Sequence, residues 1–273
     1  AKSVVLYADL LGVSEKACSP EALQHLKTIS GMMGEAVALW ENQSEFEFAT
    51  FSDSTLIAMP IDGDDIQTPL AAVVAAGAVF QATMARKGIL MRGGVTIGDF
   101  CVQPHLIFGE ALVRAAKYLE NQIAKFPRIV LDVENQELTE TFRDSTFPEI
   151  LVLEDQDDEW PRIDYLRGGI MYAPMTGRAT RKLLQGHHLH LLAEFKRTEP
   201  SDPIRAKLEW CARTELNAWK QMFADPAHTG TITDLLGFLR SRWLASVNPG
   251  EAVWMAAVGF GSFDQVVSWI SGS

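Results

Sequence analysis

The sequence is poor in cysteine and in basic residues. Its three cysteines, Cys18, Cys101 and Cys211, are odd in number and far apart among 273 residues. This spacing fits neither a disulfide framework nor a paired Cys-x-x-Cys zinc site, so a reducing, cytoplasmic location is expected. The chain holds 24 Lys and Arg against 35 Asp and Glu, for a formal net charge of -11. Such a field repels DNA and RNA, and no nucleic-acid partner is expected.

Long hydrophobic runs and low-complexity segments are also missing. Residues 1–10 hold a short apolar run without a basic region or a small-residue cleavage site, so neither secretion nor a membrane span is expected. A hydrophobic content of 47% and a charged content of 22% are typical of a globular protein. The length predicts a catalytic domain at 1–150. A partly helical extension at 151–273 is expected to pack on that domain or at a dimer interface.

What the first half does contain is a regular order of strands and helices. The expected elements are a strand at 4–8, a helix at 20–40, strands at 46–51 and 55–59, a helix at 69–87 and a strand at 91–100. This order, β-α-β-β-α-β, predicts an α+β fold with a split, ferredoxin-like sheet. The first strand would lie centrally beside the hairpin, with helices covering one face.

The second half has fewer clear elements. A helix at 110–123 and a strand at 128–132 should follow the sheet, and a further strand is expected at 150–153. Apolar spacing predicts an amphipathic helix at 205–223. The fold class is therefore α+β with an α-rich C-terminal extension.

Two aspartates lie where the predicted sheet would bring them together. Asp9 ends the first strand, and Asp53 lies near the tip of the hairpin. Either residue alone is more often a turn former than a ligand. Two carboxylates on neighbouring strand ends, however, can share hard divalent cations such as magnesium or manganese. The pair is therefore the first candidate for chemistry.

Four short motifs carry a resemblance to a known family. They are Tyr-Ala-Asp-Leu-Leu-Gly at 7–12, Phe-Ser-Asp-Ser at 51–54, Arg-Gly-Gly-Val-Thr-Ile-Gly-Asp at 92–99 and Phe-Gly-Glu-Ala-Leu-Val at 108–113. Over about residues 1–133 the chain resembles the class III nucleotidyl cyclases, and more narrowly the pyrimidine cyclases of the bacterial Pycsar anti-phage systems. The resemblance implies that Asp9 and Asp53 bind two Mn²⁺ or Mg²⁺ ions, with help from the backbone of Leu10.

The same resemblance bears on the base of the substrate. Adenylyl cyclases read adenine with a lysine shortly before the hairpin aspartate and an aspartate before the next helix, where this chain has Ala49 and, approximately, Leu106. The acid and cysteine pairing used for guanine is also missing, so a pyrimidine is expected. Ala49 and Thr50 would line the substrate site. Arg92 would donate to a base carbonyl or a phosphate, which slightly favours UTP over CTP; a solvated surface arginine is the alternative.

The family places an asparagine and then an arginine on the helix after the fourth strand. Here those positions hold Arg114 and Tyr118. Arg114 is the candidate for stabilising the transition state, and Lys117 for contacting the triphosphate. Both would reach the second subunit's site, because class III sites form in a head-to-tail homodimer. The alternative is an exposed, charged helix face.

These observations predict a cyclase that converts UTP to cyclic UMP and pyrophosphate, and thereby signals phage infection to a separate effector protein. A CTP-using or purine-using cyclase is one alternative. A non-catalytic nucleotide-binding module is another, favoured by Tyr118 in place of an arginine. His187, His188 and His190 lack zinc-site spacing and are interpreted as surface residues.

Overall fold

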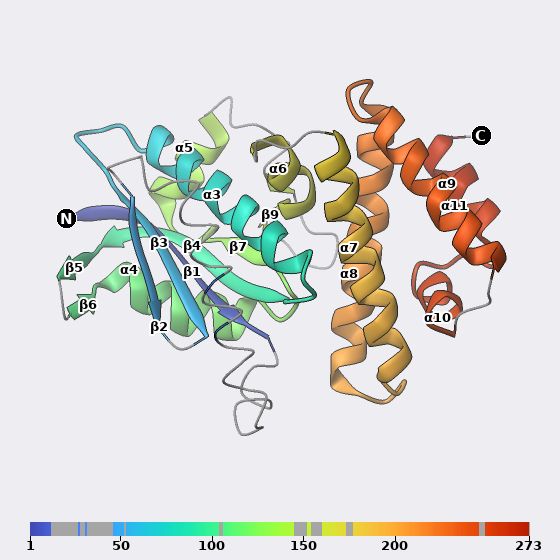
Figure 1. The fold of residues 1–273 in the computed structure, drawn as a ribbon. Coiled ribbons are helices and arrows are strands. Elements are labelled where there is room, and N and C mark those ends of the chain that lie inside the picture. Colours follow the sequence, from blue (N-terminus) through green and yellow to red (C-terminus); the bar gives the residue numbers. More distant parts are fainter. Residues whose placement is uncertain are drawn as a thin grey trace. The chain divides into compact units, whose positions relative to one another are not determined.

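The computed structural model describes most of the chain in two compact units (Figure 1). One unit comprises Ala1–Met84 and Ile89–Tyr172, and the other Ala85–Gly88 and Ala173–Ser273. The boundary thus follows Tyr172 and not residue 150, because β8 and β9 still belong to the sheet. Residues described are 1–11, 27, 31, 46–51, 53–103, 106–144, 152–153, 160–172, 177–245 and 249–272.

A mostly antiparallel sheet forms the first unit. Its seven strands have the order β2-β3-β1-β4-β7-β9-β8. Their bounds are β1 Lys2–Leu10, β2 Glu47–Phe51, β3 Ser54–Pro60, β4 Met91–Asp99, β7 Ile129–Leu131, β8 Val152–Leu153 and β9 Arg162–Ile163. β1 pairs antiparallel with both β3 and β4, while β7 runs parallel to β4. The first strand is therefore central beside the hairpin, as predicted, and the α+β class is confirmed.

β1 is buried on both faces, which explains its nearly continuous apolar sequence. On one face, Leu6 packs in a core cluster with α3 (Gln67–Ala85). The approach is close: a Cβ at Gly77 of α3 would lie 2.4 Å from Cδ1 of Leu6. α3 is apolar and long enough to cross a membrane, but 78% of its most apolar window is buried within the protein. This burial is the behaviour of a core helix and is consistent with a soluble protein.

A second helical segment covers the opposite face of β1. α4 (Glu110–Val113) continues directly into a π-helix, η1 (Arg114–Ile123). The helix predicted at 110–123 is therefore present, but most of it is π-helical. Val5 of β1 packs against Ala111 of α4. Helices thus cover both faces of the sheet, α3 on one and the α4–η1 segment on the other, and not one face as predicted. The remaining elements of this unit are the hairpin β5 (Cys101–Gln103) and β6 (Leu106–Phe108), α5 (Gln136–Asp144) and α6 (Tyr165–Tyr172).

The second unit is helical, as the sequence predicts for the C-terminal part. Its helices are α7 Gly177–Arg197, α8 Pro203–Ala224, α9 Thr229–Ala245, α10 Pro249–Ala257 and α11 Phe263–Ser271. The predicted amphipathic helix at 205–223 lies within α8. Asp202 caps that helix by accepting a hydrogen bond from the backbone of Ile204, with Pro203 in the first turn.

Two histidines depart from the sequence interpretation. His187 and His188 are only 1% and 3% exposed, so reading them as surface residues was wrong. Each places its Nδ1 2.9 Å from one carboxylate oxygen of Glu215, which is fully buried on α8. Only His190 is exposed. The spacing of three histidines on one helix could not show that a neighbouring helix supplies a carboxylate to two of them.

The helix predicted at 20–40 lies outside the described residues, except that Lys27 and Gly31 are helical.

Candidate active site

The register of β1 brings Asp9 opposite two other functional positions. Its partner on β3 is Ser54, and its partner on β4 is Arg92. Directly paired residues in a sheet point to the same face, so these side chains gather on one side of the strand ends. Side chains alternate along a strand, which places Tyr7 on this face as well. The fold thus assembles four polar side chains at one end of the sheet.

Asp53 joins this group from the turn between β2 and β3. Its backbone oxygen accepts a hydrogen bond from the backbone N–H of Leu10 at 3.1 Å, which fixes the turn against the end of β1. The negative charge of Asp53 also raises the pKa of Asp9. The structure therefore brings together the two carboxylates that the sequence singled out, although 43 residues separate them.

A chain of two hydroxyl groups supports Asp9. The Ser54 hydroxyl donates to Oδ1 of Asp9 at 3.1 Å, and the Tyr7 hydroxyl lies 2.7 Å from Ser54 Oγ. Because the Ser54 proton is used on Asp9, the Tyr7 hydroxyl is the donor in the second contact. Burial raises the pKa of Tyr7, which keeps its proton in place. Sequence reasoning gave no role to either hydroxyl, although both lie inside the quoted motifs.

Arg92 is held by a partner that the sequence did not reveal. Its Nε makes an ion pair with Glu120 of η1, whose side chain is only 4% exposed. The glycines after Arg92 allow this approach: a Cβ at Gly94 would lie 2.3 Å from Cβ of Leu119, the neighbour of Glu120. At Gly93 a Cβ would lie 2.1 Å from the backbone oxygen of Tyr7. The Arg-Gly-Gly motif is thus a requirement of close packing between β1, β4 and η1.

The carboxylates of the site outnumber the arginine side chain that neutralises them. Burial is the main cause of the raised pKa of Asp9; Asp53 adds to it, while the Ser54 hydrogen bond and Arg92 oppose it. Burial likewise raises the pKa of Glu120 against the pull of Arg92, and both aspartates contribute to that rise. Three carboxylates therefore share one guanidinium. Such a site stabilises an added cation, because each neighbouring carboxylate is relieved of repulsion.

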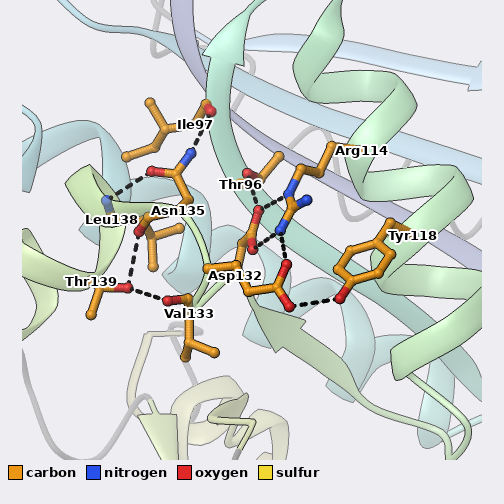
Figure 2. A network of polar contacts seen from close by, with 10 residues as sticks. Thr96, Ile97, Arg114, Tyr118, Asp132, Val133, Asn135, Leu138 and Thr139 are labelled. Atoms are coloured by element: carbon orange, nitrogen blue, oxygen red, sulfur yellow. Dashed lines mark hydrogen bonds and ion pairs between the residues drawn. The ribbon is translucent and has the colours of Figure 1, made fainter.

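Arg114 lies in a different polar network (Figure 2). Its guanidinium donates from Nη2 to Asp132 Oδ1 at 2.7 Å and to Glu134 Oε2 at 2.8 Å, and Nε also donates to Asp132. Asp132 has no solvent exposure and also accepts from the Thr96 hydroxyl at 2.7 Å. These two carboxylates raise the pKa of the Arg114 guanidinium above its usual value. Arg114 is therefore firmly held within its own chain.

This network is distant from Asp9 in the same chain. Thr96 follows Arg92 by four residues on β4, which corresponds to about 13 Å along the strand. Tyr118, where the sequence resemblance led us to expect an arginine, donates to Glu134 at 2.7 Å and lies against the Arg114 guanidinium, 4.6 Å from the ring centre. The structure does not bring Arg114 to the two aspartates.

The other residues that were expected around the substrate lie on three elements, η1, β2 and β6. Lys117 is exposed on η1. Ala49 of β2 is partly buried against the cluster that contains Leu56. Thr50, its neighbour, is exposed and pairs with Thr55. Leu106 begins β6 and is 52% exposed.

The donor set at the strand ends fits a hard divalent cation. Among the described residues, no group of three or more His, Cys, Asp and Glu side chains is arranged to enclose a metal ion. Two carboxylates with open positions suit Mg²⁺ or Mn²⁺, which fill their remaining sites with water and substrate phosphate oxygens. Asp9 and Asp53 are therefore the residues that could hold a divalent cation at this end of the sheet.

Comparisons with known proteins found structural similarity but no match in sequence. No protein-family model matches the chain, and no curated protein matches it. One solved structure that overlaps it is the adenylyl cyclase CyaB from P. aeruginosa, with 14% sequence identity and a TM-score of 0.40. That overlap covers 59% of this chain and 93% of the other.

Proposed function

We propose that the protein is a nucleotidyl cyclase of the class III type, built on a ferredoxin-like core. The observation that carries this proposal is the convergence of Asp9 and Asp53, from neighbouring strand ends, beside an arginine. A nucleoside triphosphate is an anion, and a chain of net charge -11 binds one only where metal ions and local cations offset the repulsion. Arg92 is a cation next to the carboxylate pair.

The reaction would proceed by an in-line displacement. The ribose 3′ oxygen forms a bond to the α-phosphorus, the bond from that phosphorus to the oxygen bridging to the β-phosphate breaks, and pyrophosphate leaves with that oxygen. The 3′ hydroxyl proton passes to solvent. Bound Mg²⁺ or Mn²⁺ supplies acidification of the hydroxyl and charge neutralisation on the leaving group.

Within this reaction the chain's own residues bind and orient. Asp9 and Asp53 hold the cations, and the Leu10 backbone, tied to Asp53, keeps the two strand ends together. Ser54 fixes the rotamer of Asp9. Arg92, oriented by Glu120, donates to phosphate or to a base carbonyl. These groups are held at the strand ends and in the turn beside them, which favours precise positioning of the substrate.

The finer part of the proposal concerns the base and the biological role. Ala49 and Leu106 offer no side-chain hydrogen bond to a purine edge, and this supports a pyrimidine, with UTP ahead of CTP. The product would be cyclic UMP, a signal to a separate effector in anti-phage defence. Sites formed in a head-to-tail homodimer would let Lys117 approach the triphosphate from the second subunit.

A non-catalytic, nucleotide-binding module is the second candidate, and one observation favours it. Arg114 and Tyr118 occupy the positions where class III cyclases have an asparagine and then the arginine that stabilises the transition state, and both are bound to Glu134 of their own chain. To reach a partner's site, Arg114 would have to leave Asp132 uncompensated in the interior, which costs several kcal/mol.

One experiment separates these functions. The purified protein is incubated with each of ATP, GTP, CTP and UTP in the presence of Mn²⁺, and the products are identified by mass spectrometry. Cyclic UMP as the main product is expected, with none from Asp9→Asn or Asp53→Asn. Asp99→Asn, at the exposed far end of β4, is the matched control and should retain activity. No product from any nucleotide, together with retained nucleotide binding, would support the module instead.

A further inference from the structure

The backbone around Asp9 is held on both sides, and this bears on which cation the site accepts. Asp9 lies on β1, where it is paired with Ser54 of β3 and with Arg92 of β4. A strand fixed between two neighbours cannot shift to bring further oxygens to an ion. Because ion selectivity depends on the number and flexibility of the ligands, a rigid site favours an ion that needs few protein oxygens.

The Ser54 hydroxyl occupies one oxygen of the Asp9 carboxylate. It donates to Oδ1 at 3.1 Å, whereas Oδ2 takes no side-chain hydrogen bond from the residues that the structure describes. A cation bound to both oxygens would have to share Oδ1 with the hydroxyl proton, and the partial positive charge of that proton repels a cation. The carboxylate is therefore arranged to bind an ion through Oδ2 alone.

Tyr7 fixes the direction of the Ser54 hydroxyl. The Tyr7 hydroxyl lies 2.7 Å from Ser54 Oγ and donates to it, so this oxygen accepts from Tyr7 and donates to Asp9. A serine hydroxyl has a single proton and rotates to suit its partners. Ser54 is only 6% exposed, which gives water little access to take the place of Tyr7. Tyr7 thus keeps the Ser54 proton directed at Asp9.

The described part of the chain offers no further carboxylate for a larger coordination shell. Glu120, the third carboxylate of the site, is paired with Arg92, and its side chain is only 4% exposed. No group of three or more His, Cys, Asp and Glu side chains could enclose an ion among the described residues. Ca²⁺ takes about six to eight oxygen ligands, with carboxylates that can bind through both oxygens, whereas Mg²⁺ keeps several waters and uses few carboxylates.

We propose that Tyr7 and Ser54 select the metal ion, and that through Asp9 they favour Mg²⁺ and Mn²⁺ over Ca²⁺. The proposal rests on the proposed function in one respect, the binding of a divalent cation by Asp9 and Asp53. Tyr7 and Ser54 are positioning residues, because both act through the carboxylate and neither contacts the ion. Without the two hydroxyl groups, Asp9 could offer both of its oxygens, and the disadvantage of Ca²⁺ would shrink.

The test compares the affinities of Mn²⁺ and Ca²⁺ for the whole chain freed of metal. Isothermal titration measures both, and the EPR signal of Mn²⁺ follows its displacement by Ca²⁺. The parent should prefer Mn²⁺. Ser54→Ala should lose about tenfold of that preference, with little change in the Ca²⁺ affinity, and Tyr7→Phe should lose about threefold. Tyr7→Phe should change the ratio no further when it is added to Ser54→Ala, because Tyr7 acts through Ser54.

The ratio of the two dissociation constants separates ion selection from a structural role, which would weaken both ions alike. Tyr165→Phe removes the hydroxyl of a buried tyrosine on α6 and should keep the parent's ratio. Circular dichroism establishes that each variant is folded, and Tyr7→Phe, which keeps the shape of the ring, decides the question if Ser54→Ala does not fold.

An unchanged ratio in either folded variant overturns the proposal. A parent that binds Ca²⁺ as tightly as Mn²⁺, or that binds neither ion, overturns it as well. A ratio that shifts as expected, in a protein that forms no cyclic product from any nucleotide, supports the selection of the ion and contradicts only the proposed cyclisation.

Discussion

The hydroxyl group of Ser54 donates a hydrogen bond to Oδ1 of Asp9 across the β1–β3 pair, at 3.1 Å. The contact joins the serine of the hairpin motif to the aspartate at the end of β1. It restricts the carboxylate to one rotamer and stabilises its charged form, which a bound cation requires. Ser54 thus acts on the proposed metal site through Asp9.

Removing this hydroxyl should weaken metal binding more than folding. Ser54→Ala leaves Asp9 with one donor fewer, so we expect Mn²⁺ affinity to fall about tenfold, as for other residues that orient a metal ligand. Stability should fall by about 1 kcal/mol. The pKa of Asp9 should rise further, so the loss of affinity should be larger at pH 6 than at pH 8. Isothermal titration with Mn²⁺ at both pH values checks this, and an unchanged affinity at pH 6 would contradict it.

Neutralising Asp9 should stabilise the chain while it abolishes catalysis. Its pKa is raised above the ordinary 3.8, so ionisation costs free energy in the folded state. The folded state holds its proton more tightly than the unfolded state, and stability falls as pH rises through the folded pKa. Without metal at pH 8, Asp9→Asn should therefore melt at a higher temperature than the parent.

Below about pH 4 both forms are neutral and the difference in melting temperature should shrink. Thermal unfolding at pH 4 and pH 8 in the presence of a chelator measures it. Asp99→Asn provides the control for the loss of one negative charge. A lower melting temperature for Asp9→Asn at pH 8 would show that the carboxylate is stabilising instead.

Arg114 should prove to be a structural residue within its own chain. Arg114→Ala leaves Asp132 buried without its guanidinium, and we expect a loss of about 2–4 kcal/mol, because breaking a buried pair exposes the desolvation cost of the remaining charge. Asp132→Asn in the same chain should recover part of that loss. Urea unfolding measures both, with Lys117→Ala on the exposed face of η1 as the neutral control. A stable Arg114→Ala protein without activity would instead favour the transition-state role.

A side chain at Gly94 should push η1 off the sheet. Gly94→Ala places a methyl group 2.3 Å from Cβ of Leu119, and we expect a cost of about 1–3 kcal/mol together with reduced activity, because Glu120 would shift away from Arg92. Leu119→Ala should restore part of the stability. Gly98→Ala on the same strand is the matched control, since its methyl group would lie 3.4 Å from Ala111. Equal effects of the two glycine substitutions would contradict this account.

Glu215 should control the acid stability of the helical unit. Its pKa lies below the ordinary 4.5, because its two imidazole partners outweigh burial. The stability that it contributes is therefore complete above about pH 4.5 and is lost as pH falls through its folded value. Glu215→Gln should be destabilised at pH 7, where the amide cannot accept from both rings, and should lose stability less steeply on acidification. Urea unfolding at pH 7 and pH 4 checks this, with Glu209→Gln as the control.

The sequence was sufficient for features that depend on local pattern. The apolar run of β1, the hairpin around Asp53 and the helix from 110 each follow from the periodicity of their own residues. The closeness of Asp9 and Asp53 was predicted as well, because the element order places the first strand beside the hairpin that carries Asp53. The domain boundary was less accurate: two short strands, β8 and β9, belong to the sheet by pairing that no local pattern records.

The partners of the charged residues could not be predicted. The neighbours of Arg92 and Arg114 in the sequence do not show which carboxylates these residues bind. In the structure, Arg92 pairs with Glu120 beside Asp9, and Arg114 pairs with Asp132 and Glu134. His187 and His188 likewise have their carboxylate on another helix. Each pairing joins residues 18 to 28 positions apart, and an ion pair leaves no periodic signature along the chain.

The amino-acid sequence by itself determined the strand and helix order, the acidic balance and the placement of two aspartates at strand ends, because burial and backbone propensity act on neighbouring residues. Only the tertiary structure decided which cations remain near those aspartates. It aligned Ser54 and Arg92 with Asp9 through sheet register, and it committed Arg114 to Asp132. The physical reason is that charges pair through space, and the fold alone sets which charges meet.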